Sequence, residues 1–198
     1  LELYSPLANR LGVWELKWEL EDMSFRFLHP DTYKKVAKML DEKRLEREQF
    51  IADAIVRLRQ ELKTVGVENA EIYGRPKHIY SIWNKMRKKD VDFSEVYDVR
   101  ALRVIVDDIK DCYTVLGIVH NMWTPIPKEF DDYISNPKGN YYRSLHTAVR
   151  CPDGRSLEVQ IRTWDMHKHA ELGVAAHWRY KEGGGVPNVA YDEKIALL

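Results

Sequence analysis

A short apolar run, ALRVIV at residues 101–106, carries a single charged residue, Arg103, in its middle. Branched and apolar residues in such a run are typical of a buried strand, where a charged side chain is costly unless it has a partner. The preceding residues, EVYDVR, add a carboxylate at Asp98 and a second guanidinium at Arg100. The run therefore predicts a central strand that brings charged groups to one end of a buried sheet.

The segments around this strand alternate between strand-like and helix-like patterns. AEIYG (70–74) predicts a short strand, RPKHIYSIWNKMRKK (75–89) a basic helix and IKDCYTVLGIVHNMW (109–123) an apolar helix. A loop rich in proline and aspartate is expected next. RSLHTAVRCPDGRSLEVQIRT (143–163) then predicts a hairpin that turns at Asp153–Gly154, and a last helix should run from Trp164 to the glycines at 183–185. The order β-α-β-α-β-β-α predicts an α+β fold, a mixed sheet flanked by helices.

The first third of the chain is expected to be a helical extension without chemistry of its own. Ser5 followed by Pro6 is typical of a helix start, and Gly12 is a candidate break. Residues 32–65 have the apolar stripe of one long amphipathic helix that ends at Gly66. We therefore divide the chain into an extension (1–69), a functional domain (70–185) and a tail (186–198).

Composition limits the classes of protein to consider. The 198 residues include 31 basic and 31 acidic side chains, so the net charge favours no polyanionic partner. No apolar run approaches the roughly 20 residues that a membrane span needs, and Cys112 and Cys151 are too far apart for a CxxC metal motif. We expect a cytoplasmic protein with reduced thiols. Because the chain begins without methionine, we also expect it to be part of a longer protein.

Charged residues gather where chemistry is possible. Residues 71–90 contain six basic and two acidic side chains. Glu158, Gln160 and Arg162 alternate along one predicted strand and should share one face, which in most sheets is merely solvated. Asp98, however, introduces the other predicted central strand. Two carboxylates in one cleft ringed by basic residues would hold a divalent metal against phosphates, and would repel each other without it.

Five segments in order resemble the synthetase domain of the RelA/SpoT alarmone enzymes: YGRPKHIYSIW, YDVRALRVIV, NYYRSLHTAV, LEVQIRT and AELGVAAHWRYK. The resemblance covers roughly residues 70–183, and residues 1–69 resemble the family's link to an N-terminal hydrolase domain. It implies a nucleotidyltransferase-like fold. It also implies transfer of pyrophosphate from ATP to the 3′-hydroxyl of GDP or GTP, making (p)ppGpp in the stringent response.

The resemblance implies roles for individual residues. Asp98 and Glu158 would be the catalytic and metal-binding pair: Asp98 would bind Mg²⁺, and Glu158 would face the metal and take the proton of the attacking hydroxyl. Two arginines would sandwich the adenine, which suits a planar guanidinium. The implied ATP-binding residues are Arg75, Lys77, Ser81, Lys85 and Arg103.

The same resemblance implies a pocket for the guanine nucleotide, with Tyr142 stacked on the base. The residues of this pocket would be Lys138, Asn140, Tyr142, His146 and Gln160. Glu129, Asp131 and Asp132 match the acidic E-x-D-D segment of family members without a working hydrolase, which implies the RelA-type synthetase-only branch.

Two features depart from the family pattern. Strict alternation puts Asp98 and Arg103 on opposite faces of a strand, so either Asp98 should lie on a turn before the regular pairing, or a bulge should lie between the two residues. The acceptor loop reads KGNYYRS at 138–144 instead of the usual KPNGYQS, with Tyr141 in place of a glycine. If that position needs a positive φ, Tyr141 would strain or reshape the loop.

Other interpretations stay open. A nucleotidyltransferase that moves AMP would use the same carboxylates without a guanine-stacking loop. An RNA-binding module would use the basic helix and exposed aromatic rings, and its affinity would fall steeply with salt. A degenerate synthetase fold would bind nucleotides without turnover. Beyond ATP and GDP or GTP, a ribosome or RNA could be a partner through other parts of a longer parent; no membrane partner is expected.

Overall fold

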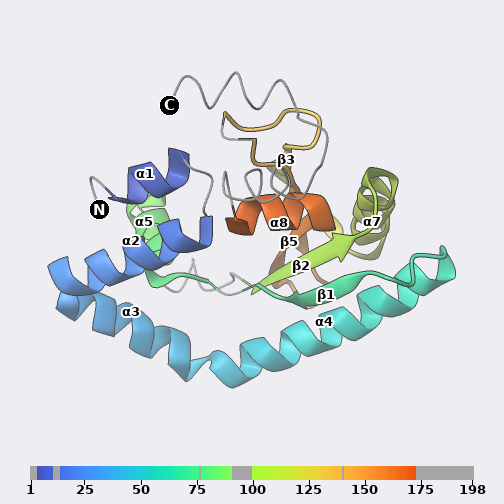
Figure 1. The fold of residues 1–198 in the computed structure, drawn as a ribbon. Helices are drawn as coiled ribbons and strands as arrows, with labels where there is room; N and C mark the ends of the chain where they lie inside the picture. Colours follow the sequence, from blue (N-terminus) through green and yellow to red (C-terminus); the bar gives the residue numbers. More distant parts are fainter. Residues whose placement is uncertain (1–3, 11–13, 76, 91–99, 140, 173–198) are drawn as a thin grey trace, which may run out of the picture.

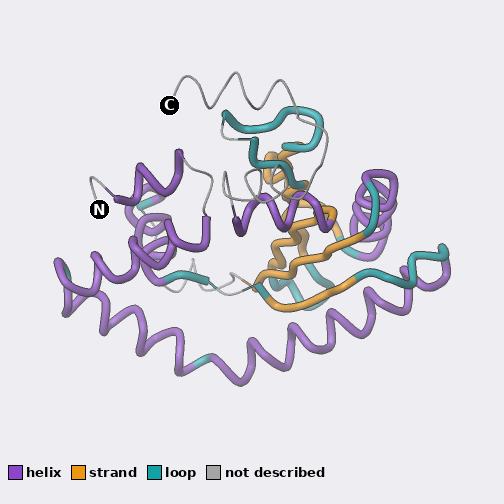
Figure 2. The backbone as a smooth tube through the Cα atoms, viewed as in Figure 1, coloured by secondary structure: helices purple, strands orange, loops and turns teal. Residues whose placement is uncertain are grey.

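The computed structural model describes residues 4–10, 14–75, 77–90, 100–139 and 141–172 (Figures 1 and 2). Its helices are α1 (Tyr4–Arg10), α2 (Trp14–Leu28), α3 (Pro30–Glu42), α4 (Arg44–Thr64), α5 (Ile79–Lys89), α7 (Ile109–Met122) and α8 (Trp164–Leu172). Its strands are β1 (Glu71–Gly74), β2 (Arg100–Val106), β3 (Thr124–Asp132), β4 (Leu145–Arg150) and β5 (Ser156–Thr163). The predicted break at Gly12, the predicted helix end at 183–185 and the tail 186–198 lie outside the described residues.

The strands form one mixed sheet in the order β1-β2-β5-β4-β3. β2 and β5 pair in parallel, and the other neighbours pair antiparallel. The predicted β4–β5 hairpin is present, and Gly154 in its turn has a φ of 84°, which glycine adopts without a steric penalty. Helices flank this sheet, so the predicted α+β class is confirmed (Figure 1).

The predicted loop after Trp123 is wrong in its first part, because Thr124–Asp132 form strand β3 at the end of the sheet. Most of its side chains are exposed, and Pro125 and Pro127 lack backbone N–H groups, so the apolar alternation of a strand is missing. The prolines are tolerated because β3 has a neighbour on one side only. The pairing with β4 shifts register between Pro125 and Phe130, and Lys128 within that stretch has a φ of 65°.

One face of the sheet is apolar and carries the main core. Leu102 and Val104 of β2 and Val159 and Ile161 of β5 are each at most 1% exposed. Helices α4 and α7 pack against this side (Figure 1). Their contributions to the core are Ala54, Leu58, Leu62, Cys112, Val115 and Val119.

Cys112 and Cys151 are both buried free thiols. No described helix has the length and apolarity of a membrane span.

The single helix predicted for residues 32–65 is wrong, because α3 ends at Glu42 and α4 begins at Arg44. Lys43 between them has φ −108° and ψ 13°, outside the α-helical range. The two helices bury different stripes: Val36 of α3 packs with Ile82 of α5, whereas Leu58 of α4 packs into the sheet core. The break therefore lets one amphipathic segment serve two clusters, as its bend in Figure 2 shows.

The N-terminal helices gather around α5 at one end of the molecule (Figure 1). Phe25 of α2 is fully buried there, and its ring centroid lies 4.6 Å from that of Trp83 on α5. Tyr80 of α5 and Tyr33 of α3 meet Phe25 edge-on at 5.7 and 6.2 Å. This aromatic cluster fixes α5 against the extension rather than against the sheet core.

Leu58 provides a test of the α4 packing. Leu58→Ala should lower the free energy of unfolding by about 2–5 kcal/mol, because it removes a fully buried side chain from the core. Val56→Ala on the same helix, where Val56 is 57% exposed, should change it by less than about 0.5 kcal/mol. Urea unfolding followed by circular dichroism measures both. Equal losses in the two variants would contradict the described packing.

Candidate functional site

A row of polar side chains crosses the face of the sheet opposite the apolar core. The register aligns Tyr73 of β1 with Arg103 of β2, Arg103 with Gln160 of β5, Gln160 with His146 of β4, and His146 with Asp131 of β3. Because side chains in one row of a sheet point to the same side, these five form a continuous polar strip. The alternation predicted for Glu158, Gln160 and Arg162 on β5 is thus extended across the four other strands.

Hydrogen bonds join most of this strip. Arg103 donates from Nε to Gln160 Oε1 at 2.6 Å and from Nη1 to the Tyr73 hydroxyl at 3.3 Å. Gln160 Nε2 in turn donates to the Tyr142 hydroxyl and lies 3.2 Å from His146 Nε2. The Arg103 guanidinium, only 8% exposed, is therefore held in a fixed plane.

Glu158 lies in the next row of the same face, between Ala101 of β2 and Ala148 of β4. The two alanines leave open space beside its carboxylate. Lys77, from the segment after β1, donates to Glu158 Oε2 at 2.5 Å, and Lys85 of α5 donates to Oε1 at 3.0 Å. Burial alone would raise the pKa of Glu158, but the two ammoniums outweigh it and lower the pKa to about 2. The carboxylate is therefore ionised and paired.

This pairing gives Glu158 partners other than the carboxylate expected from the sequence. Glu158 was expected to be repelled by a second carboxylate in the absence of metal, whereas both of its oxygens are bound to lysines. Asp98, the proposed partner, lies outside the described residues. Among the residues that the structure describes, no three His, Cys, Asp or Glu side chains are grouped closely enough to hold a metal.

Guanidinium groups surround the same centre. Burial lowers the pKa of Arg75 and, together with the nearby Arg103, lowers the pKa of Arg162 to about 10. Arg162 is 2% exposed; its Nη2 bonds His167 of α8 at 2.7 Å, while its Nε has no partner among the described residues. Burial also lowers the pKa of Lys77 to about 8. Such a concentration of buried cations favours an anionic ligand.

The acceptor loop packs its tyrosine inward. Tyr142 is 6% exposed, and its hydroxyl lies 2.8 Å from His146 Nε2. The Lys138 ammonium lies over two rings, 4.4 Å from the centroid of Tyr133 and 5.2 Å from that of Tyr142. Tyr141 has a φ of 59°, so the position where the family has glycine does adopt the left-handed conformation. Asn140 lies outside the described residues.

The three acidic residues of the E-x-D-D segment have different surroundings. Glu129 and Asp131 line a cavity of about 130 Å³ on the polar face together with Arg75, His146 and Glu158. Asp132 instead closes a turn, accepting from Ile134 N at 3.0 Å, Ser135 N at 2.9 Å and the Tyr113 hydroxyl at 2.9 Å.

The structure brings together most of the predicted site residues. Those that lie on or beside the polar face are Arg75, Lys77, Lys85, Arg103, Glu129, Asp131, Tyr142, His146, Glu158 and Gln160. Ser81 is exposed one turn before Lys85 on α5. Sequence reasoning missed Tyr73, although it alternates with the buried Ile72, and gave Arg162 no role. The signal that could have found both residues is the strand alternation: each is next to a buried apolar residue in its strand, so its side chain points to the opposite, polar face.

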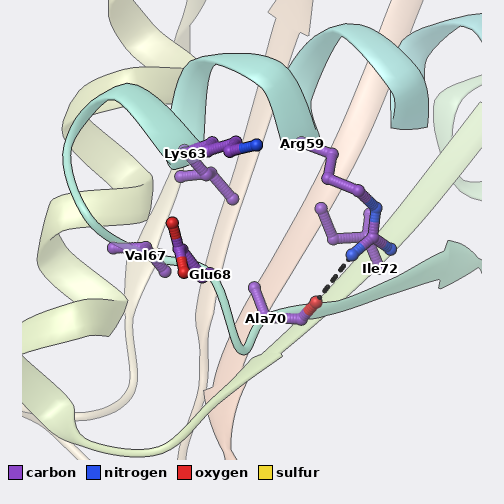
Figure 3. Close-up of a pocket in the computed structure, with 7 residues that line it drawn as sticks. Arg59, Lys63, Val67, Glu68, Ala70 and Ile72 are labelled. Atoms are coloured by element: carbon purple, nitrogen blue, oxygen red, sulfur yellow. Dashed lines mark hydrogen bonds between the residues drawn. The ribbon is translucent and has the colours of Figure 1, made fainter.

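A second cavity, of about 300 Å³, lies away from this face, where α4 meets β1 (Figure 3). Leu62, Val67, Ala70 and Ile72 supply its apolar lining. Arg59 on its rim donates to the Ala70 carbonyl at 3.2 Å, so this guanidinium already has an acceptor. The polar face, with its ionised carboxylate and surrounding cations, is the better candidate for chemistry.

Comparisons with known proteins agree with this choice. Residues 74–185 match the family described as "Region found in RelA / SpoT proteins". The sequence is 58% identical to a GTP pyrophosphokinase of Haemophilus influenzae over 196 residues and 56% identical to one of Escherichia coli K12 over 198 residues. Each match includes 99% of this chain but 26% of the relative, so the chain spans about a quarter of their length.

A solved structure is also similar. Small alarmone synthetase 1 of Bacillus subtilis, bound to its product pppGpp, matches with a TM-score of 0.53 and 25% sequence identity. The match covers 83% of this chain and 87% of that one. The similarity thus includes part of the helical extension as well as the sheet.

Asp132 provides a test of the assignment that this residue closes a turn, whereas Glu129 and Asp131 line the cavity. Asp132→Ala should lower the free energy of unfolding by about 1 kcal/mol, because two backbone amides of the turn lose their acceptor. Asp132→Asn keeps an acceptor oxygen and should recover most of that loss. Urea unfolding measures both, and full stability of the alanine variant would contradict the assigned turn.

Proposed function

This chain belongs to the RelA/SpoT family, and on that basis we propose that it transfers pyrophosphate from ATP to the 3′-hydroxyl of GDP or GTP. The 3′-oxygen would bond to the β-phosphorus of ATP while the bond to the α-phosphate oxygen breaks, giving AMP and (p)ppGpp. The observation that carries this proposal is Glu158, an ionised carboxylate between two alanines, bound by two lysines on a cationic face. The relatives named as GTP pyrophosphokinases support it.

The ATP half would lie on the side of β1 and α5. Arg75 and Arg103 would hold the adenine between their guanidiniums, and the bonds from Arg103 to Gln160 and Tyr73 would keep one of these planes fixed. Lys77, Ser81 and Lys85 would bind the phosphates. Since both lysines are bound to Glu158, phosphate oxygens would compete with that carboxylate for the ammoniums.

Glu158 would take the proton of the 3′-hydroxyl. A carboxylate with a pKa near 2 is a weak base while both lysines hold it. Movement of the ammoniums onto the triphosphate would raise that pKa. The two lysines would thus couple ATP binding to activation of the acceptor hydroxyl, which limits proton removal to the complex with both substrates.

Mg²⁺ would be held by Glu158 and Asp98. Carboxylate oxygens are the ligands that Mg²⁺ prefers, and the space between Ala101 and Ala148 leaves Glu158 accessible once its lysines move. When bound, the ion would neutralise charge on the ATP phosphates. The chain itself supplies the remaining electrostatic stabilisation through Lys77, Lys85 and the buried arginines.

The guanine nucleotide would bind on the β4 side of the face. Tyr142 would stack on the base, with Lys138, Asn140, His146 and Gln160 around it. Lys138 lies over the Tyr142 ring, so a base that stacks there would displace the ammonium. The displaced lysine could then reach an anionic group of the same nucleotide.

The acidic segment favours a parent protein of the synthetase-only branch, and we expect it to act in the cytoplasm. Glu129 and Asp131 line the site cavity and could influence nucleotide or metal preference, whereas Asp132 closes its turn. A ribosome or RNA would be reached through other parts of the parent.

Replacing Glu158 by glutamine tests the function. Wild-type chain with ATP, Mg²⁺ and GDP or GTP should release AMP and (p)ppGpp, separable by anion-exchange chromatography. Glu158→Gln should lower turnover at least about 100-fold, because the base is lost. Glu68→Gln, at an exposed carboxylate away from the face, should match wild type. A wild-type chain that instead transfers AMP, or that binds RNA without turnover, would overturn the proposal.

The same variant has a predicted effect on stability. Glu158→Gln should lower the free energy of unfolding at neutral pH by roughly 1–3 kcal/mol, because two lysines lose their charged partner. A carboxyl whose pKa falls from 4.5 to about 2 on folding adds stability above pH 4.5, and this contribution is lost as the pH falls toward 2. The wild-type excess over the variant, measured by urea unfolding, should therefore shrink in that window.

Tyr142 tests the guanine assignment. Tyr142→Ala should weaken binding of GDP about tenfold or more, because stacking on a base is worth about 1–3 kcal/mol, while ATP binding changes little. Tyr141→Ala at the adjacent, more exposed position is the matched control. Isothermal titration on variants with native circular dichroism measures both affinities. If Tyr141→Ala causes the larger loss, the stacking residue is Tyr141.

A further inference from the structure

Helix α2 of the extension provides the cap of α5. The Asp22 carboxylate accepts from the backbone N–H of Tyr80 at 2.7 Å and of Ile79 at 3.3 Å, at the start of α5. His78, the residue in the N-cap position, makes no side-chain cap bond of its own, and its Nδ1 lies 3.5 Å from Asp22 Oδ2. The first amides of a helix need an acceptor, and here it comes from more than fifty residues away in sequence.

Trp18 lies one turn before Asp22 and contacts the same segment. Its ring stacks on His78 with a centroid distance of 5.1 Å and an interplanar angle of 25°. The Arg75 guanidinium also lies over Trp18, 5.4 Å from the centroid of its ring. Cation–π contact and stacking therefore hold the two ends of residues 75–78 against one tryptophan.

The residues involved share one face of α2. Trp18, Asp22 and Phe25 follow the i, i+4, i+7 spacing, and Phe25 packs on Trp83 one turn further along α5. On the opposite side, the Arg75 backbone N–H donates to the Ala101 carbonyl of β2 at 2.8 Å. The segment that carries the proposed ATP-binding residues Arg75, Lys77, Ser81 and Lys85 is thus fixed between the sheet and the extension.

We propose that Trp18 and Asp22 are positioning residues of the ATP half of the site, so that the extension sets ATP affinity. This inference rests on the proposed function. It differs from simple packing of α2, because Asp22 is a carboxylate with 22% of its side chain exposed, and it holds the start of α5, the helix from which Ser81 and Lys85 project. It differs from the expectation that the first third has no part in the chemistry.

The first test uses the cap. Isothermal titration with α,β-methylene ATP, whose bridge replaces the bond to be broken, and separately with GDP would compare wild type, Asp22→Ala and Asp22→Asn. Asp22→Ala should weaken binding of the ATP analogue about fivefold, the factor by which loss of a cap commonly destabilises a helix. It should weaken GDP binding by less than about twofold. Asp22→Asn keeps an acceptor oxygen and should restore most of the affinity. Glu19→Ala, an exposed position on the same helix, should match wild type.

The second test uses the ring. Trp18→Leu should weaken binding of the ATP analogue more than that of GDP, and Trp18→Phe should restore part of the loss because it keeps an aromatic face for Arg75 and His78. Leu16→Ala, at a position 46% exposed on α2, is the matched control. Hydrogen exchange at the Ile79 and Tyr80 amides should quicken in Asp22→Ala, independently of any nucleotide.

The outcomes separate the two proposals. A selective loss of ATP-analogue affinity with rescue by Asp22→Asn supports the positioning role. If wild type binds the analogue, and Asp22→Ala and Trp18→Leu bind it with the same affinity as wild type, the positioning role is overturned but the proposed function is not. Equal losses for the analogue and GDP would mean that α2 stabilises the fold without directing ATP, which also overturns it. Absence of analogue binding by wild type would overturn the proposed function and the inference together.

Discussion

The parallel pairing of β2 with β5 is the constraint on which the rest of the site depends. It places Arg103 beside Gln160 and Ala101 beside Glu158, so that one face of two adjacent strands carries the polar groups. The other face of the same strands carries Leu102, Val104, Val159 and Ile161 against α4 and α7. A slip of one residue would exchange the two sets and bury Glu158 in the apolar core, so the core itself fixes the register of the site.

A face of this kind is stable only while its charges remain paired. Glu158 is held by two lysines, and Arg103 by an amide and a hydroxyl. Burial lowers the pKa of Lys77 to about 8, so its ammonium holds the proton weakly compared with an ordinary lysine. A polyanionic ligand would reverse that effect, which means that occupancy of the site and protonation of Lys77 are linked.

Much of the fold was predictable because its core strands follow local rules. β1, β2, β4, β5 and the intervening helices were expected from apolar runs, alternation and the Asp153–Gly154 turn. β3 was missed because an exposed strand with two prolines has no apolar signal, and the break at Lys43 was missed because its cause is the presence of two separate packing partners. The contacts of Asp22 with α5 and of Lys85 with Glu158 join distant segments, and no local pattern reveals such pairs.

The shape of the two outer strands has a consequence for how the molecule behaves in a crowded solution. An outer strand presents unpaired N–H and C=O groups that can recruit a strand from another chain and start aggregation. β1 offers four residues, and β3 is interrupted by Pro125, Pro127 and the register shift, with Glu129 and Asp131 beside them. Neither offers a long, regular template. The sheet can therefore keep a polar face open for ligands without inviting strand-to-strand association between chains.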